Sequence, residues 1–150
     1  MKQPRKTWHI GTMTGLLACC ALAPPAFAIE GYWQFKETGE IIQFSACGSA
    51  LCAKIAALAP EERQSRDVNN PDPALRRRPL CGLPVIEGLK ARNPGRWVHG
   101  SAYSPEDGNA YDLSLSQQEE GTLVMKASVK GLGFLAKTYV LGAVPRPGAC

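Results

Sequence analysis

Apolar and polar residues alternate with a period of two in short stretches of the chain from residue 31 onward. This period places neighbouring side chains on opposite faces of a β-strand. The stretches recur at intervals of about 8 to 12 residues and end in turn residues, a spacing typical of an all-β barrel or sandwich. The pattern predicts strands at residues 31–37, 41–46, 51–58, 82–90, 96–103, 109–117, 122–129 and 134–143.

Eight such strands, joined mostly by short turns, predict a small up-and-down antiparallel barrel that residues 29–150 form as a single domain. The interior of an eight-stranded barrel can be filled by side chains or can hold one small ligand. The apolar faces of the strands would therefore either fill the interior or line a pocket. The candidates for a cavity lining are Trp33, Phe35, Phe44, Tyr111, Leu113 and Met125.

The connection between the third and fourth predicted strands, residues 59–79, is much longer than the other turns. It is polar and Pro-rich and has no periodicity. A helical turn is possible at residues 61–66, but the prolines that follow exclude a longer helix. Loops of this length in compact domains are usually functional lids or mobile segments. We expect the loop to lie over the mouth of the barrel, with Asp67, Asn70, Asp72 and Arg78 as its candidate site residues.

The loop also offers oxygen ligands for Ca²⁺ at Asp67, Asn70 and Asp72. The EF-hand pattern is absent, however, and Asp or Asn before Pro is ordinary turn chemistry. We therefore expect a structural role, in which Asp67 and Asn70 bond backbone amides of the loop and Arg78 pairs with Asp72. No metal site is predicted here.

The first 28 residues have the three parts of an export signal. Lys2, Arg5 and Lys6 form a positive n-region, residues 10–23 form an apolar h-region, and Ala26-Phe27-Ala28 forms a cleavage site. We expect cleavage after Ala28 and a mature protein in the periplasm or secreted.

The N-terminal sequence is also compared with a membrane span and a lipoprotein signal by its length and motifs. The apolar run is too short to span a bilayer, and no second run of about 18 apolar residues follows, so no transmembrane segment is predicted. Residues 16–19, Leu-Leu-Ala-Cys, loosely match a lipidation box, so anchoring as a lipoprotein at Cys19 is the alternative.

Four of the six cysteines remain after the predicted cleavage: Cys47, Cys52, Cys81 and Cys150. Thiols tend to pair in an oxidising compartment. The spacing favours a Cys47–Cys52 disulfide, since the two residues flank a four-residue turn and can face each other across a hairpin. The runner-up pairs Cys52 with Cys81. Cys150 could reach Cys81 or stay free.

Charge and composition exclude several classes of function. Without Lys2, Arg5 and Lys6, the chain has 14 basic and 13 acidic residues. This nearly neutral balance lacks the basic face that nucleic-acid binding requires. The cysteine spacing lacks the paired knuckles of structural zinc sites, and His99 is the one histidine past the signal. His99 and Ser101 share a strand, but no nucleophile motif accompanies them, so we expect no catalysis.

A series of short motifs runs through the chain. It comprises Gly31-Tyr32-Trp33, Cys47-Gly48 with Leu51-Cys52, Asp67, Asn70-Pro71-Asp72-Pro73, the segment from Arg78 to Leu83, Trp97, and the segment from Tyr103 to Gly108 with Tyr111. In this order the motifs resemble DUF2147, a bacterial envelope family of unknown function, over residues 31–129. The resemblance implies an exported, lipocalin-like barrel without an established activity. The family usually has a Gly-Gly pair where His99-Gly100 stands here.

These observations favour a non-catalytic binder of a small hydrophobic ligand such as a lipid or fatty acid, because few polar anchors interrupt the apolar face. The alternative is a filled barrel that acts as a protein-interaction or envelope-assembly module through its loops or outer face. We expect no cofactor and no nucleic acid. The sequence names no protein partner, and we expect a monomer or a weak dimer.

Overall fold

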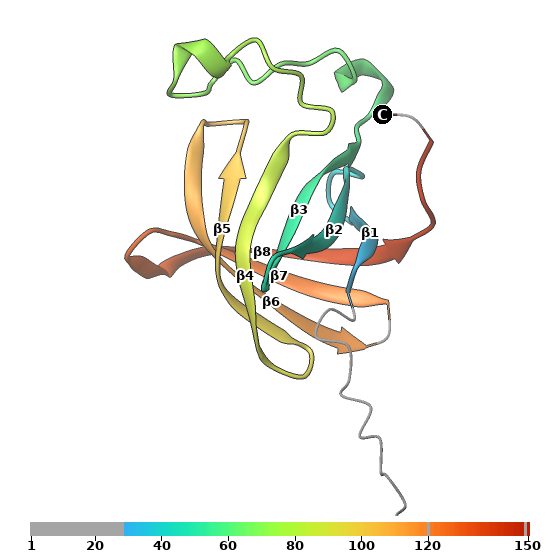
Figure 1. Cartoon of the computed structure of the whole chain (residues 1–150), viewed down its shortest axis with the longest axis vertical. Coiled ribbons are helices and arrows are strands. Elements are labelled where there is room, and N and C mark those ends of the chain that lie inside the picture. Colours follow the sequence, from blue (N-terminus) through green and yellow to red (C-terminus); the bar gives the residue numbers. More distant parts are fainter. Residues whose placement is uncertain (1–28, 120, 149) are drawn as a thin grey trace, which may run out of the picture.

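Eight antiparallel strands close into one barrel, in which each strand pairs with its neighbours in sequence and β8 pairs with β1 (Figure 1). The computed structural model describes residues 29–119, 121–148 and 150, so the predicted signal peptide and Cys19 lie outside the described residues. The strands are β1 (Gly31–Phe35), β2 (Ile41–Cys47), β3 (Ala50–Ala57), β4 (Pro84–Asn93), β5 (Arg96–Ser104), β6 (Asn109–Glu119), β7 (Thr122–Val129) and β8 (Leu132–Val144). The predicted up-and-down barrel is confirmed.

The long connection between β3 and β4 lies across one end of the barrel (Figure 1). It contains two short 3₁₀ helices, η1 (Pro60–Glu62) and η2 (Pro73–Leu75). Proline opens both helices, at a position where its fixed φ and missing N–H cost nothing. No helix in the described part of the chain is both long and apolar enough to cross a membrane.

The strand order divides the barrel into two halves. The closed half is the end at which β2 turns into β3, β4 into β5 and β6 into β7, and its interior is filled by large side chains. Trp33 is part of this filling, and its indole Nε1 donates a hydrogen bond of 2.9 Å to the Ile29 carbonyl oxygen. The residues packed with it include Phe44, Leu51, Leu89, Trp97, Leu115, Leu123 and Leu141, all of them buried.

The open half is the opposite end, where β1 turns into β2, β5 into β6 and β7 into β8, and where the long connection lies. Its strand ends carry smaller or partly buried side chains toward the interior, among them Phe35, Ala102 and Ala127. The two halves are made from the same eight strands and the same alternation, and they differ in what their inward positions hold.

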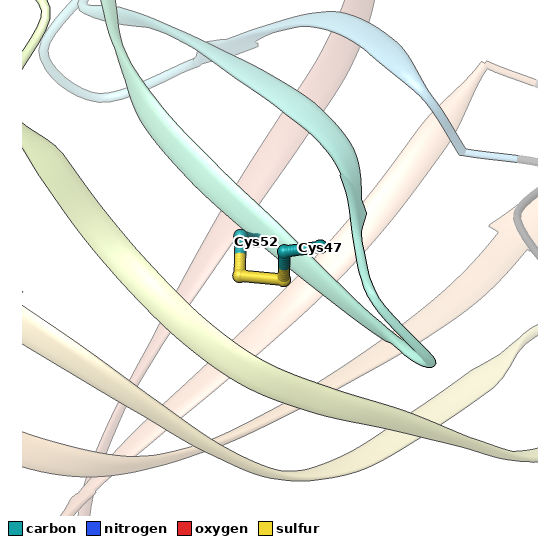
Figure 2. Close-up of a disulfide and its surroundings, with 2 residues drawn as sticks. All are labelled: Cys47 and Cys52. Carbon is teal, nitrogen blue, oxygen red and sulfur yellow. A yellow bond between two sulfur atoms is a disulfide. The ribbon is translucent and has the colours of Figure 1, made fainter.

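Two disulfides stabilise the ends of this architecture. Cys47 and Cys52 join β2 to β3 beside their turn, with 5.8 Å between the two Cα atoms (Figure 2). This is the pairing that the four-residue turn favours. Cys81, at the end of the long connection, is joined to Cys150, so the alternative pairing of Cys52 with Cys81 is wrong. The C-terminal tail runs back from the end of β8 toward the long connection to make this link (Figure 1).

A backbone irregularity in β5 lies at the position where the resembled family usually has a Gly-Gly pair. The register of β5 against β6 shifts between Trp97 and Gly100, and His99 has a φ of 61°, in the left-handed region that favours glycine. A Cβ atom at Gly100 would lie 2.6 Å from Cγ of Leu89, so only glycine fits there without moving the core. The glycine at 100 is therefore required by packing, whereas His99 occupies a glycine-like conformation.

Candidate functional site

A cavity of about 790 Å³ lies in the open half of the barrel. Its walls come from the strand ends of that half, and its cover comes from the long connection, through Ser65, Arg66, Val68 and Asn69. Pockets for small molecules typically have volumes of about 300 to 1,000 Å³. The interior of this barrel is therefore solid at one end and hollow at the other.

The lower wall of the cavity is apolar. Phe35 of β1 lies 5.7 Å from Tyr139 of β8, measured between ring centroids, with the rings in an edge-to-face arrangement. Aromatic pairs prefer this geometry, which fixes both rings as a surface on one side of the cavity. The other apolar side chains of the wall are Ile42, Ile55, Leu58, Leu80, Val85, Ile86, Met125 and Ala127.

Glu40 introduces a carboxyl group into this apolar surface. It lies just before β2, and the alternation that turns Ile42 inward also turns Glu40 inward. Among the described residues, no hydrogen-bond donor satisfies its carboxylate. Burial, together with repulsion from Glu62 and Glu106, raises the pKa of Glu40 to about 7. Glu40 is thus a carboxyl group that loses its proton near neutral pH at the edge of an apolar cavity.

The cover of the cavity is held by a buried carboxylate, that of Asp67, which has no exposed surface. The Tyr103 hydroxyl donates to its Oδ1 at 2.5 Å, while Asn70 Nδ2 and Arg78 Nε each donate to its Oδ2 at 2.8 Å. Asn70 Nδ2 also donates to the Tyr103 hydroxyl at 3.1 Å. The Arg78 guanidinium lies 5.7 Å from the centre of the Tyr103 ring, a cation–π contact.

These contacts determine the charge state of the cluster. Burial alone would raise the pKa of Asp67, but the hydrogen bonds from Tyr103, Asn70 and Arg78 together outweigh burial and lower it. Asp67 is therefore an ionised, fully bonded carboxylate. Because Tyr103 belongs to β5 and also lines the cavity, the cluster joins the long connection to the barrel wall.

A second attachment holds the cover to the turn between β5 and β6. Asn69 Nδ2 donates to the carbonyl oxygens of Pro105 and Glu106, at 3.2 and 2.7 Å. Gly108 lets the turn approach the loop closely, since a Cβ atom on it would lie 2.0 Å from the Asn69 carbonyl oxygen. The cover is thus docked at two places by polar contacts.

The predicted cavity residues are divided between the two halves. Phe35, Tyr111 and Met125 line the cavity. Trp33, Phe44 and Leu113 do not, because they are buried in the packed core. The strand face of each residue was predicted correctly, but three of the six lie away from the cavity.

The predicted loop residues also differ in their roles. Asp67, Asn70 and Arg78 form the buried cluster, and none of them lines the cavity. The expected pairing of Arg78 with Asp72 is wrong, because Arg78 forms its ion pair with Asp67. Asp72 instead accepts a hydrogen bond from Ala74 N at the start of η2, and its own N–H donates to Asn70 Oδ1.

Sequence reasoning missed the polar groups that line the cavity, namely Glu40, Tyr103, Tyr139 and Lys137. Glu40, Tyr139 and Lys137 have inward positions by the period of two, which was the available signal, whereas Tyr103 adjoins the inward Ala102. Lys137 Nζ lies 4.8 Å from the centre of the Tyr139 ring, so its charge rests against the aromatic wall. At the rim, Tyr111 donates a hydrogen bond to Asp107, which lowers the pKa of Asp107 to about 2.

His99 lies apart from the cavity, in a groove of about 470 Å³ on the outer face of the barrel. Its neighbours there include Asp112, Ser114, Lys126 and Ser128. No hydroxyl among the described residues is hydrogen-bonded to His99, and the same part of the chain contains no group of three His, Cys, Asp or Glu side chains placed to hold a metal ion.

Comparison with solved structures supports the fold. Protein HP1028 from the human pathogen Helicobacter pylori, described as belonging to the lipocalin family, is similar to this chain with a TM-score of 0.72 and 23% sequence identity. The similarity covers 77% of this chain and 82% of that protein. At this identity the match concerns the architecture, which is therefore lipocalin-like.

The family is given by the sequence itself. No curated protein matches the chain. A family model does match it over residues 31–141, which is most of the sequence. That model describes an uncharacterised protein conserved in bacteria. The matched residues run from the first strand into the last and include the cover of the cavity, so the chain belongs to the DUF2147 family.

Proposed function

We propose that this protein is an exported, non-catalytic binder that holds a small hydrophobic ligand in the cavity of its open half. The observation that carries the proposal is the cavity of about 790 Å³ with its apolar wall. Apolar walls with a few placed polar groups are typical of small-molecule sites. A filled barrel would have no such space.

The architecture favours binding over catalysis. Eight-stranded barrels of the lipocalin type commonly hold one small ligand. The polar groups of the cavity lining include Glu40, Tyr103, Tyr139 and Lys137, and behind Tyr103 the ion pair of Asp67 with Arg78 is already fully bonded. A nucleophile would need an activating base near its own pKa. The hydroxyl–carboxylate contact of Tyr111 with Asp107 at the rim does not provide one, because its hydrogen bonds lower the pKa of Asp107 to about 2.

Export is supported by the N-terminal sequence and by the cysteines. The first 28 residues have the pattern of a signal peptide, and the four cysteines that follow form two disulfides. Disulfides form and persist in oxidising compartments such as the bacterial periplasm. We propose that Ile29 begins the mature protein.

Ligand binding can be tested with N-phenyl-1-naphthylamine, an uncharged probe that fluoresces in apolar surroundings. The purified protein should bind it saturably at one site. Ala127→Phe places a large side chain in the cavity and should weaken binding by about tenfold or more. Ser128→Phe is the matched control, because the neighbouring side chain belongs to the groove on the outer face. Absence of saturable binding, or equal binding by the two variants, would refute the proposal.

The location and the natural ligand can be examined together by native mass spectrometry of the full-length product recovered from a bacterial periplasm. A mass that begins at Ile29 supports export with cleavage, and an added lipid mass at Cys19 supports the lipoprotein alternative. A discrete extra mass that leaves on activation would identify the bound molecule.

A second function is favoured by the hairpin of β7 and β8. Phe134 is 80% exposed there and Leu135 is 50% exposed, with Val129 and Leu132 also exposed. Exposed apolar groups that gather in one place often mark interaction sites. The alternative of an interaction module therefore applies to this hairpin, on which Leu132 and Phe134 lie outside the cavity while Val129 and Leu135 also line it. The filled interior that this alternative assumes does not fit the cavity.

A further inference from the structure

The charged groups around the cavity distinguish between classes of amphiphilic ligand. Apart from Glu40, four charged residues approach the cavity from the cover and from the turn between β5 and β6: Glu62, Arg66, Glu106 and Asp107. A fifth, Lys137, comes from β8. Carboxylates therefore outnumber cations by four to two in the lining.

The two cations are already engaged by groups of the protein. Arg66 Nη1 donates a hydrogen bond of 2.7 Å to the Arg77 carbonyl oxygen, and Lys137 lies against the ring of Tyr139. Asp107 accepts the Tyr111 hydroxyl. Glu40 is different, because it is half-buried beside the apolar wall and no donor among the described residues is hydrogen-bonded to its carboxylate.

Two other carboxylates of the lining act on Glu40. Besides burial, the charges that raise its pKa are those of Glu62 and Glu106. The negative charges of Glu62 and Glu106, both in the cavity lining, therefore act on Glu40. A carboxylate head group placed there would be repelled, whereas a cationic head group would supply the missing partner.

We propose that the cavity selects a cationic amphiphile, with an alkyl chain along the apolar wall of Phe35, Ile42, Ile55 and Met125 and an ammonium head group at the Glu40 carboxylate. This inference rests on the proposed binding function and narrows its ligand. It disfavours fatty acids, although their chains would fit the same wall.

The test compares three ligands with the same chain: dodecyltrimethylammonium, dodecanol and dodecanoate. Each displaces N-phenyl-1-naphthylamine from the full mature protein below its micelle concentration, at about pH 8, where Glu40 is mostly ionised. The cation should bind about tenfold more tightly than dodecanoate. Glu40→Gln should reduce this preference to about threefold or less and leave dodecanol binding within about twofold.

Glu37→Gln is the matched control, because Glu37 is exposed in the same β1–β2 turn and its loss removes the same charge. It should keep the preference for the cation. Since dodecyltrimethylammonium does not titrate, its affinity for the wild-type protein should also rise by about fivefold to tenfold between pH 6 and pH 8, as Glu40 loses its proton. Reference side-chain carboxyl groups, lysines and guanidinium groups titrate outside this range, and His99 lies in the groove on the outer face, away from the cavity.

The outcomes separate the two proposals. Binding of the probe and of dodecanol without a preference for the cation, or a preference that Glu40→Gln leaves intact, overturns the inference and keeps the binding function. Tighter binding of dodecanoate, or of the cation at low pH, also overturns it. Failure of the probe and all three ligands to bind overturns the binding function and the inference with it.

Discussion

The closed and open halves of the barrel are built from the same strands, yet they use them for different purposes. In the closed half, Trp33 and Phe44 are almost fully buried and the interior is packed. In the open half, Phe35 and Tyr139 are partly buried and face a cavity. The difference lies in the side chains at inward positions and in the cover, not in the topology.

Two carboxyl groups of the open half show how the cavity can remain accessible while the cover stays in place. Asp67 is fully buried and takes donors from Tyr103, Asn70 and Arg78, so its pKa is lowered. Glu40 is in apolar surroundings without such donors, and its pKa is raised to about 7. A satisfied carboxylate stabilises structure, whereas an unsatisfied one is available to a ligand.

The sharpest comparison of the two halves substitutes one phenylalanine in each. Phe44→Ala should lower the free energy of unfolding by about 4 kcal/mol, because it leaves a void in a close-packed core. Phe35→Ala should cost less than about 2 kcal/mol, since Phe35 already borders empty space. Urea unfolding of both variants measures the difference. Equal losses would mean that the halves are packed alike.

The two disulfides should differ in the same measurement. Cys81–Cys150 closes a loop with a sequence separation of 69 residues, and the separation of Cys47 and Cys52 is 5. The chain-entropy model gives about 4 kcal/mol for the longer loop and about 2 kcal/mol for the shorter one. The double variants Cys81→Ser/Cys150→Ser and Cys47→Ser/Cys52→Ser should therefore rank in that order, and the reverse ranking would contradict the account of the cover.

Asp67→Asn should cost about 3 kcal/mol, because it removes the charge that Arg78 and two further donors require in a buried place. Asp72→Asn makes the same chemical change in the same loop and should cost less than about 0.5 kcal/mol, since Asn caps a helix as well as Asp does. Because the pKa of Asp67 is lowered on folding, its contribution is complete above the ordinary pKa of 3.8 and is lost as the pH falls further. An equal effect of the two variants would exclude the cluster as the main anchor.

Glu40 should have the opposite pH dependence. Its pKa rises from 4.5 in the reference state to about 7 in the folded protein, so the folded state holds its proton more tightly. The free energy of unfolding, relative to that of Glu40→Gln, should therefore fall by up to about 3 kcal/mol between pH 4.5 and 7. Above pH 7 it should level off. Unfolding free energies of the two proteins at several pH values show this directly, and a constant difference would place Glu40 in water.

The barrel was predictable because its signals are local. Alternation within each strand and turn residues between strands depend on neighbours in sequence, and so does the Cys47–Cys52 hairpin. The Cys81–Cys150 link and the ion pair of Arg78 with Asp67 depend on how distant segments meet. For Arg78 the sequence offered Asp67 and Asp72 as partners, and only the folded loop distinguishes them.

The cavity was predictable only in part, for a geometric reason. A period of two gives the face of a strand, so Phe35, Tyr111 and Met125 were placed inward correctly. It does not give the depth along the barrel, which depends on strand tilt and stagger. Trp33, Phe44 and Leu113 therefore share the inward face but lie in the packed core. Glu40 lies two residues before Ile42 and so shares its inward face, but it was missed because its position belongs to the preceding turn.

The most direct test of the central claim, that one half of the barrel is packed and the other binds a ligand, is a methyl NMR titration of the mature protein with dodecanol. We predict shifts in the methyl groups of the cavity wall, at Ile42, Ile55 and Met125, and unchanged signals from the closed half, at Leu51, Leu115 and Leu123. Shifts confined to the exposed Leu132 on the outer hairpin, or no saturable shifts at all, would contradict the account.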